Sequence, residues 1–147
     1  MKKLTWGLVL ALPWALAVGC EQTRSAEATG EAAKTQWVTA LDDALARAEA
    51  KGKPVFVKFY ATWCGPCRKM DAETLANAEV RKALERFVPV KIDVDKQEAL
   101  SDEHGVEYLP TLMVLDAAGK RHAKGEGYMN VQELLGFLAT GARKAAE

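Results

Sequence analysis

The chain has 147 residues, enough for one ordinary domain and a short additional segment. Its hydrophobic content of 49% supports a buried core and excludes a wholly disordered chain. Lys and Arg together number 20, as do Asp and Glu, so the composition does not indicate the basic face of a nucleic-acid-binding protein.

The first residues have the pattern of an export signal. Lys2 and Lys3 give a short basic start, and a mostly apolar run over residues 4–18 follows. This run is shorter than the roughly 20 residues that cross a bilayer as a permanent helix. We therefore predict a signal peptide over residues 1–19.

The predicted signal peptide ends at a cysteine. Residues 16–20, with the letters LAVGC, resemble the bacterial lipobox, in which the cysteine is acylated and becomes the new N-terminus. Ala17 departs from the usual Leu of that motif. By this likeness Cys20 carries lipid and anchors the protein at the periplasmic side of a bacterial membrane. Glu21 at the next position favours the outer membrane. The alternative is an ordinary signal peptide, an incidental Cys20 and a soluble periplasmic protein.

A tether and then a folded domain are predicted after Cys20. Residues 21–35 contain no large apolar side chain, so the segment 20–35 is expected to be a lipidated cysteine with a flexible linker. The domain is predicted over 36–147. It opens with apolar residues at helical spacing, and Gly52 and Pro54 then end the helix; these apolar residues are Trp37, Leu41, Ala44, Leu45 and Ala48.

The remaining elements alternate between strands and helices. Residues 55–61 form a dense apolar run typical of a strand buried on both faces. Asn130 and Glu133 have the spacing of a capping box at the start of a closing amphipathic helix from Val131. The other expected elements are helices over 68–75, 77–86 and 97–104 and strands over 87–94, 111–115 and 121–126, the last at an edge.

This order predicts an α/β domain with a mixed sheet. Strands separated by helices favour parallel pairing with right-handed crossovers, and the final two strands favour one antiparallel hairpin. The pattern contains no internal repeat and no second domain.

Two cysteines lie where the first predicted strand meets the next helix. The N-terminus of a helix carries partial positive charge and unpaired N–H groups, which stabilise a thiolate on Cys64. Cys64 is therefore predicted to be the nucleophile, and Cys67, one turn along the helix, to be the resolving thiol. Pro66 suits the first helical turn, where its missing N–H is not needed.

Two other readings of the cysteine pair stay open. A structural disulfide is compatible with export, although a bridge over so short a loop restrains the unfolded chain little. Zinc would need two further ligands, and only His104 and His122 are present. We expect His104 at a helix end on the surface and His122 exposed on a strand, with no metal and no catalytic role for either.

Two segments resemble the thioredoxin superfamily. Residues 59–70, with the letters FYATWCGPCRKM, are similar to its active-site segment, and residues 105–112, GVEYLPTL, to its second signature. The resemblance implies a thioredoxin fold over about residues 36–145, with a central mixed sheet flanked by helices. It also implies that Pro110 is cis beside the disulfide; the alternative is a trans proline starting a strand.

The same resemblance suggests which residues meet a client. The Leu109 backbone would pair with an extended peptide near Cys64, and Trp63, Gly65, Pro66 and Pro110 would contact it. Residues 71–80 look similar to the C-terminal domain of DsbD-type thiol:disulfide interchange proteins. The interval between the two signatures is too short for the central insertion of TlpA- and ResA-like proteins.

Lys58 departs from the family pattern. Thioredoxins usually carry a buried Asp six residues before the first cysteine, and Lys58 stands there. Strand alternation puts Lys58 on the face of Phe56 and Tyr60, from which its cation could tune the cysteine pKa from behind the disulfide. Alternatively, its head reaches water and has no chemical role.

The sequence thus predicts an extracytoplasmic thiol:disulfide oxidoreductase with no cofactor beyond its own dithiol. Gly65-Pro66 matches the dipeptide of reducing thioredoxins, which favours a reductase. Protein thiols and disulfides would be its substrates, and a transmembrane reductant donor of DsbD type an implied partner of a monomer. The alternatives are a disulfide oxidase or isomerase, and a non-catalytic module that holds protein clients.

Overall fold

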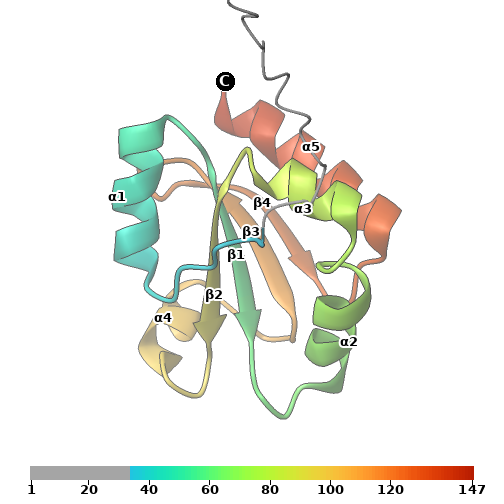
Figure 1. Cartoon of the computed structure of the whole chain (residues 1–147). Coiled ribbons are helices and arrows are strands. Elements are labelled where there is room, and N and C mark those ends of the chain that lie inside the picture. The colour runs from blue at the N-terminus through green and yellow to red at the C-terminus, as the bar shows by residue number, and fades with distance from the viewer. Residues whose placement is uncertain (1–33) are drawn as a thin grey trace, which may run out of the picture. The chain divides into compact units, whose positions relative to one another are not determined.

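A computed structural model describes residues 34–147. The predicted signal peptide, Cys20 and most of the predicted tether lie outside these residues. The described chain forms an α/β domain of nine elements (Figure 1). In chain order they are α1 (Leu41–Lys51), β1 (Val55–Tyr60), α2 (Gly65–Glu73), α3 (Ala78–Leu84), β2 (Val88–Asp93), α4 (Glu98–Glu103), β3 (Thr111–Leu115), β4 (Arg121–Glu126) and α5 (Val131–Ala145).

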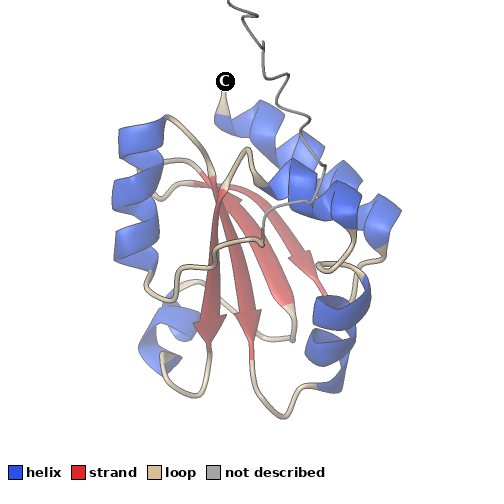
Figure 2. Cartoon of the chain, viewed as in Figure 1, coloured by secondary structure: helices blue, strands red, loops and turns tan. Residues whose placement is uncertain are grey.

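The four strands form one mixed sheet in the order β2-β1-β3-β4. β1 pairs with β2 in parallel and with β3 in antiparallel, and β3 and β4 form the antiparallel hairpin that the sequence predicts. β4 is an edge strand, as expected. Figure 2 shows helices on both faces of this sheet. The predicted fold class is therefore confirmed.

The strand β1 lies at the centre and is buried on both faces, as its apolar run indicates. Val55, Val57 and Phe59 pack into the cluster under α1. Phe56 packs on the opposite side, in the cluster formed with α2, α3 and α5. Because side chains alternate along a strand, Lys58 points to the same side as Phe56, toward α2.

The first helix begins later than its apolar spacing suggests. Val38 is in extended conformation and bridges β2, because its N–H donates to the oxygen of Pro89 and its own oxygen accepts from the N–H of Lys91. Trp37 therefore lies on the other side of the sheet, with its ring centroid 6.1 Å from that of Phe56. Helical spacing alone could not reveal this bridge, which depends on a strand far along the chain.

The closing helix α5 carries the predicted capping box in full. The Asn130 side chain accepts from the N–H of Glu133, and the Glu133 carboxylate accepts from the N–H of Asn130. None of the helices within residues 34–147 has the length and apolar character needed to cross a membrane.

Candidate functional site

The cysteine pair lies at the carboxyl end of β1, where α2 begins. Cys64 is the N-cap residue of α2, and its sulfur accepts a hydrogen bond from the N–H of Cys67 at 3.2 Å. Pro66 stands in the first turn, as its residue type favours. The helix starts at Gly65, three residues earlier than predicted, so the positive end of its dipole is directed at the Cys64 sulfur.

Cys64 and Cys67 form a disulfide, with their Cα atoms 5.3 Å apart. Both are largely buried, Cys64 with 4% of its surface exposed and Cys67 with 1%. Cys64 lines an open groove, whereas Cys67 is not among the residues that line it. An incoming partner would therefore meet Cys64 first.

The second predicted motif lies against the disulfide although it is far away in the sequence. The Leu109–Pro110 peptide bond is cis, as the resemblance implies. Leu109 packs against the small cluster of Ala61, Cys64 and Cys67. Among residues 34–147, the Leu109 backbone has no backbone hydrogen-bond partner. The Pro110 oxygen accepts a hydrogen bond from the N–H of Gly127. Leu109 thus lines the groove and has main-chain hydrogen-bonding groups that are not paired within the described residues.

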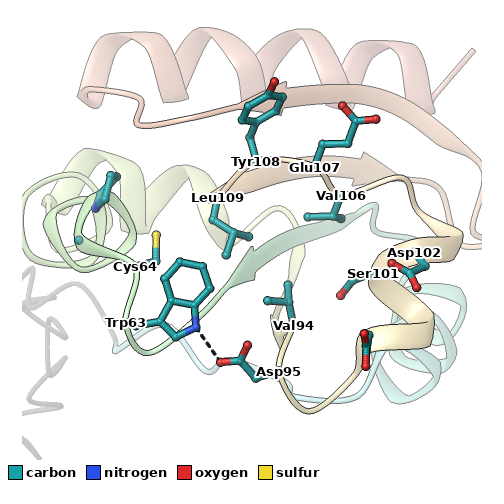
Figure 3. A pocket seen from close by; sticks show the side chains of 13 residues that line it. Trp63, Cys64, Val94, Asp95, Ser101, Asp102, Val106, Glu107, Tyr108 and Leu109 are labelled. Atoms are coloured by element: carbon teal, nitrogen blue, oxygen red, sulfur yellow. Dashed lines mark hydrogen bonds between the residues drawn. The ribbon is translucent and has the colours of Figure 1, made fainter.

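The groove beside Cys64 has a volume of about 760 Å³ (Figure 3). Trp63 and Tyr108 are its large exposed apolar side chains, with 68% and 63% of their surface exposed. The Trp63 ring is held in place because its Nε1 donates to the Asp95 carboxylate at 3.0 Å. The full lining consists of Trp63, Cys64, Gly65, Pro66, Val94, Asp95, Glu98, Ser101, Asp102, Val106, Glu107, Tyr108 and Leu109.

Lys58 lies behind the disulfide and is fully buried. Its Nζ donates to the main-chain oxygen of Cys67 at 3.1 Å and to Oδ1 of Asp71 at 2.8 Å. The alternative in which the Lys58 head reaches water is therefore wrong. The side chain turns instead toward α2, because Asp71 offers a carboxylate there and a buried ammonium requires such a partner.

Asp71 is a residue of this site that the sequence reasoning missed. The same Oδ1 also accepts from Lys91 at 2.6 Å, and Lys91 lies over the Trp37 ring, 4.6 Å from its centroid. The available signal was helical spacing, since Asp71 lies four residues after Cys67 and so shares its face of α2. The carboxylate absent from β1 is thus supplied from α2.

The charges of this network shift one another's protonation. Burial lowers the pKa of the Lys58 ammonium, and its bond with Asp71 opposes that effect. Burial alone would raise the pKa of Asp71, but the hydrogen bonds from Lys58 and Lys91 outweigh it and hold that pKa below its usual range. The network contains two basic groups and one acidic group, so its fully charged form has a net positive charge.

The contacts of the two histidines are with residues other than the two cysteines. His104 follows α4, and its ring packs against Phe59 with 5.7 Å between centroids. His122 is not exposed as expected, because its Nε2 lies 2.8 Å from Oδ2 of Asp116 and only 14% of its side chain is accessible. That hydrogen bond also lowers the pKa of Asp116. In the part of the chain from residue 34 onward, no three His, Cys, Asp or Glu residues cluster as a metal site would require.

Comparison with known proteins gives a consistent result. The family described as Thioredoxin-like matches residues 36–117. The chain is 40% identical to thioredoxin Y2, chloroplastic, of Arabidopsis thaliana over 114 residues, which cover 77% of this chain and 64% of that protein. The chain thus spans less than two thirds of this relative.

Solved structures share the fold. The thioredoxin from Thermus thermophilus superposes with a TM-score of 0.69 at 27% identity, over 76% of this chain and 91% of that one. The C-terminal domain of DsbD from Neisseria meningitidis, in its oxidised form, gives a TM-score of 0.59 at 26% identity, over 72% and 99% of the two chains. The expected likeness to the DsbD C-terminal domain is confirmed.

These relatives and the Cys64–Cys67 pair together support thiol:disulfide oxidoreductase activity. The match to the thioredoxin-like family extends over residues 36–117, more than half of the chain, and includes the bonded cysteines and the cis proline. The chain therefore belongs to the thioredoxin-like family.

Proposed function

We propose that this protein is an extracytoplasmic thiol:disulfide oxidoreductase that reduces disulfides in protein substrates. The observation that carries the proposal is the Cys64–Cys67 disulfide at the start of α2, with Cys64 facing an open groove. A purely structural bridge would have no need of a groove, exposed aromatic side chains and a free main chain at Leu109 around it. The dipeptide Gly65-Pro66 supports the reducing direction.

The reaction is an exchange in two steps. The Cys64 thiolate of the reduced protein attacks one sulfur of a client disulfide, which forms a mixed disulfide and releases the other client sulfur as a thiolate. The Cys67 thiol then loses its proton and attacks the Cys64 sulfur, which releases the second client thiolate and restores the Cys64–Cys67 bond. The client gains two electrons and takes up protons, and the protein loses two electrons.

The residues around the cysteines would support these steps. The dipole of α2 and the N–H of Cys67 stabilise charge on the Cys64 sulfur. An extended client segment would pair with the Leu109 backbone and rest on Trp63, Gly65, Pro66 and Pro110. We assign Lys58 as a group that tunes the cysteine pKa, because its ammonium is buried against the Cys67 carbonyl.

The activity is tested by insulin reduction with dithiothreitol as electron donor. The full chain carrying Cys20→Ala, which removes the third thiol, should reduce insulin, and the same chain with Cys64→Ser and Cys67→Ser should not. Cys67→Ser alone should accumulate a mixed disulfide through Cys64, which intact-mass measurement detects. Client binding without turnover by the unsubstituted dithiol would instead favour a non-catalytic module.

The predicted leader supports a location at the periplasmic side of a bacterial membrane, with Cys20 as the lipid attachment site and the outer membrane favoured. In that location the dithiol needs a source of electrons, and a transmembrane donor of DsbD type fits this need. Cys20→Ala should move the protein from the membrane fraction to the soluble fraction. An unchanged membrane fraction would refute lipid anchoring at Cys20.

A further inference from the structure

The charged side chains that line the groove beside Cys64 are all acidic. Four of its 13 lining residues are carboxylates, and none is Lys, Arg or His. In Figure 3 the labelled Asp95 and Asp102 lie beside the space that Cys64 and Leu109 face, and the Glu107 side chain points outward at its edge. The four carboxylates come from three segments: Asp95 after β2, Glu98 and Asp102 on α4, and Glu107 in the loop before β3.

The two carboxylates on α4 differ in how well they suit the helix. Glu98 lies in the first turn, where a negative charge is favourable. Glu98 and Asp102 are four residues apart, and like charges at that spacing destabilise a helix by a few tenths of a kcal/mol. Asp102 also lies in the last turn of α4, where a negative charge opposes the helix dipole. Local stability therefore gives no reason for the position of Asp102, whereas a positively charged ligand in the groove does.

Basic side chains close to the groove have partners other than the four groove carboxylates. Lys96 lies 3.7 Å from the Asp93 carboxylate, and Arg68 donates to the main-chain oxygen of Thr62. Lys124 pairs with Glu126, and its Nζ also donates to the main-chain oxygen of Gly105 at 2.8 Å, beside the lining residue Val106. No ion pair formed among residues 34–147 includes any of the four groove carboxylates. Their charges are therefore available to a bound partner.

We infer that the groove selects client disulfides flanked by lysine or arginine side chains. The inference rests on the proposed exchange at Cys64 and names its substrate class. A basic side chain next to the client cysteine would meet the carboxylates of α4 and Glu107 while its disulfide lies at Cys64. The exposed rings of Trp63 and Tyr108 offer a second favourable contact to the same cations.

The acidic groove also acts against other clients. A disulfide flanked by Glu or Asp would bring like charges into the groove, which lowers both the rate of encounter and the affinity. The tripeptide disulfide of glutathione carries net negative charge and should be disfavoured for the same reason. The charge pattern thus favours basic protein segments over acidic small disulfides.

The experiment compares three synthetic peptides that differ only in the residues flanking a single internal disulfide, which are Lys, Gln or Glu. The full chain with Cys20→Ala is first reduced, and single-turnover reduction of each peptide is followed by acid quench and mass spectrometry. At low ionic strength the Lys peptide should react about tenfold faster than the Glu peptide, with the Gln peptide between them. The difference should nearly vanish at 1 M salt, where the Debye length is about 3 Å.

A triple variant tests whether the groove is the source of the preference. Glu98→Gln, Asp102→Asn and Glu107→Gln together should reduce the Lys-to-Glu rate ratio to about twofold or less. The control combines Asp43→Asn, Glu49→Gln and Glu85→Gln, which change the net charge equally at exposed positions that do not line the groove. The control should keep the full ratio.

The outcomes separate the two proposals. Equal rates for all three peptides, or an equal loss of preference in the groove variant and the control, would overturn the selection of basic clients and leave the proposed exchange intact. Failure of the reduced protein to react with any of the peptides would overturn both.

Discussion

The side-chain nitrogen of Lys58 donates a hydrogen bond to the main-chain oxygen of Cys67, the second cysteine of the disulfide, at 3.1 Å. This places a fully buried cation behind the pair of sulfurs, where a thioredoxin usually has a carboxylic acid. An ammonium cannot take up a proton as a carboxylate does. Its contribution is instead to stabilise negative charge on a nearby thiolate.

Replacing Lys58 with Met should therefore raise the pKa of the Cys67 thiol by roughly one unit, since a nearby opposite charge shifts a pKa by about this amount or more. The measurement is thiolate absorbance against pH in a background of Cys20→Ala and Cys64→Ser, where Cys67 is the only thiol. In the intact dithiol, the reduction potential should become more negative by up to about 30 mV, because the reduced state loses the stabilisation of its thiolate.

Lys91→Met is the matched control, because it removes a second cation from the same Asp71 oxygen without a contact to Cys67. It should shift the Cys67 pKa less than Lys58→Met does. Equal shifts would show that the contact with the Cys67 carbonyl is not decisive, and no shift in either variant would leave Lys58 with a structural role only.

Asp71→Asn should destabilise the protein at neutral pH by about 2 kcal/mol, less than for a fully buried pair because 37% of the Asp71 side chain is exposed. The pKa of this carboxyl is held below its unfolded value near 3.8, so its stabilising effect is present above that pH and is lost as the pH falls through the lower folded-state pKa.

Thermal unfolding across the acid range measures this effect. Below about pH 3.8, the melting temperature of the unsubstituted protein should approach that of Asp71→Asn. Parallel curves with a constant gap down to the lowest pH would contradict the assignment of the low pKa to this ion pair.

Two glycines of α5 should respond oppositely to alanine. At Gly141 an added Cβ would lie 2.6 Å from Cγ2 of Val114 on β3, so Gly141→Ala should destabilise the protein by about 1–3 kcal/mol through overpacking. At Gly136 nothing lies within 4 Å of an added Cβ, and the better helix propensity of alanine should stabilise by about 1 kcal/mol. Urea denaturation measures the free energy of unfolding of each variant. A change of the same sign in both would contradict the close packing of α5 on β3.

Trp63→Ala should leave folding stability nearly unchanged, since 68% of the residue is exposed and its bond to Asp95 lies at the surface. The rate of insulin reduction should fall severalfold, because the ring forms part of the surface that a protein client covers. Reaction with the small neutral disulfide of mercaptoethanol should change less. An equal loss with both substrates would indicate that Trp63 acts on the disulfide itself rather than on client binding.

Local patterns were sufficient for most of the fold. The apolar run of β1, the N-cap pattern at Asn130 and the hairpin before α5 are set by neighbouring residues, and the structure contains all three. The start of α1 could not be predicted in the same way. Val38 is extended because it pairs with Val90, and no residue next to it encodes this pairing.

The candidate site likewise has features that local sequence predicts and features that depend on distant contacts. Cys64, Cys67 and Pro110 lie in compact motifs, and the structure brings these motifs together. Lys58 was identified by its departure from a family pattern, but its burial depends on Asp71 from another element. The charge of the groove depends on three separate segments, so it emerges only when the chain is folded.

The series of contacts from Trp37 to Cys67 affects where the N-terminus of a truncated domain can be placed. Trp37 covers Lys91, Lys91 binds Asp71, and Asp71 holds the buried cation at the disulfide. Trp37, at the start of the domain, is thus connected to Cys67 through the charged side chains of Lys91, Asp71 and Lys58. A fragment beginning after Val38 would keep all four strands and the bonded cysteines, yet it would lose the bridge of Val38 to β2 and would expose Lys91 and its carboxylate partner to water.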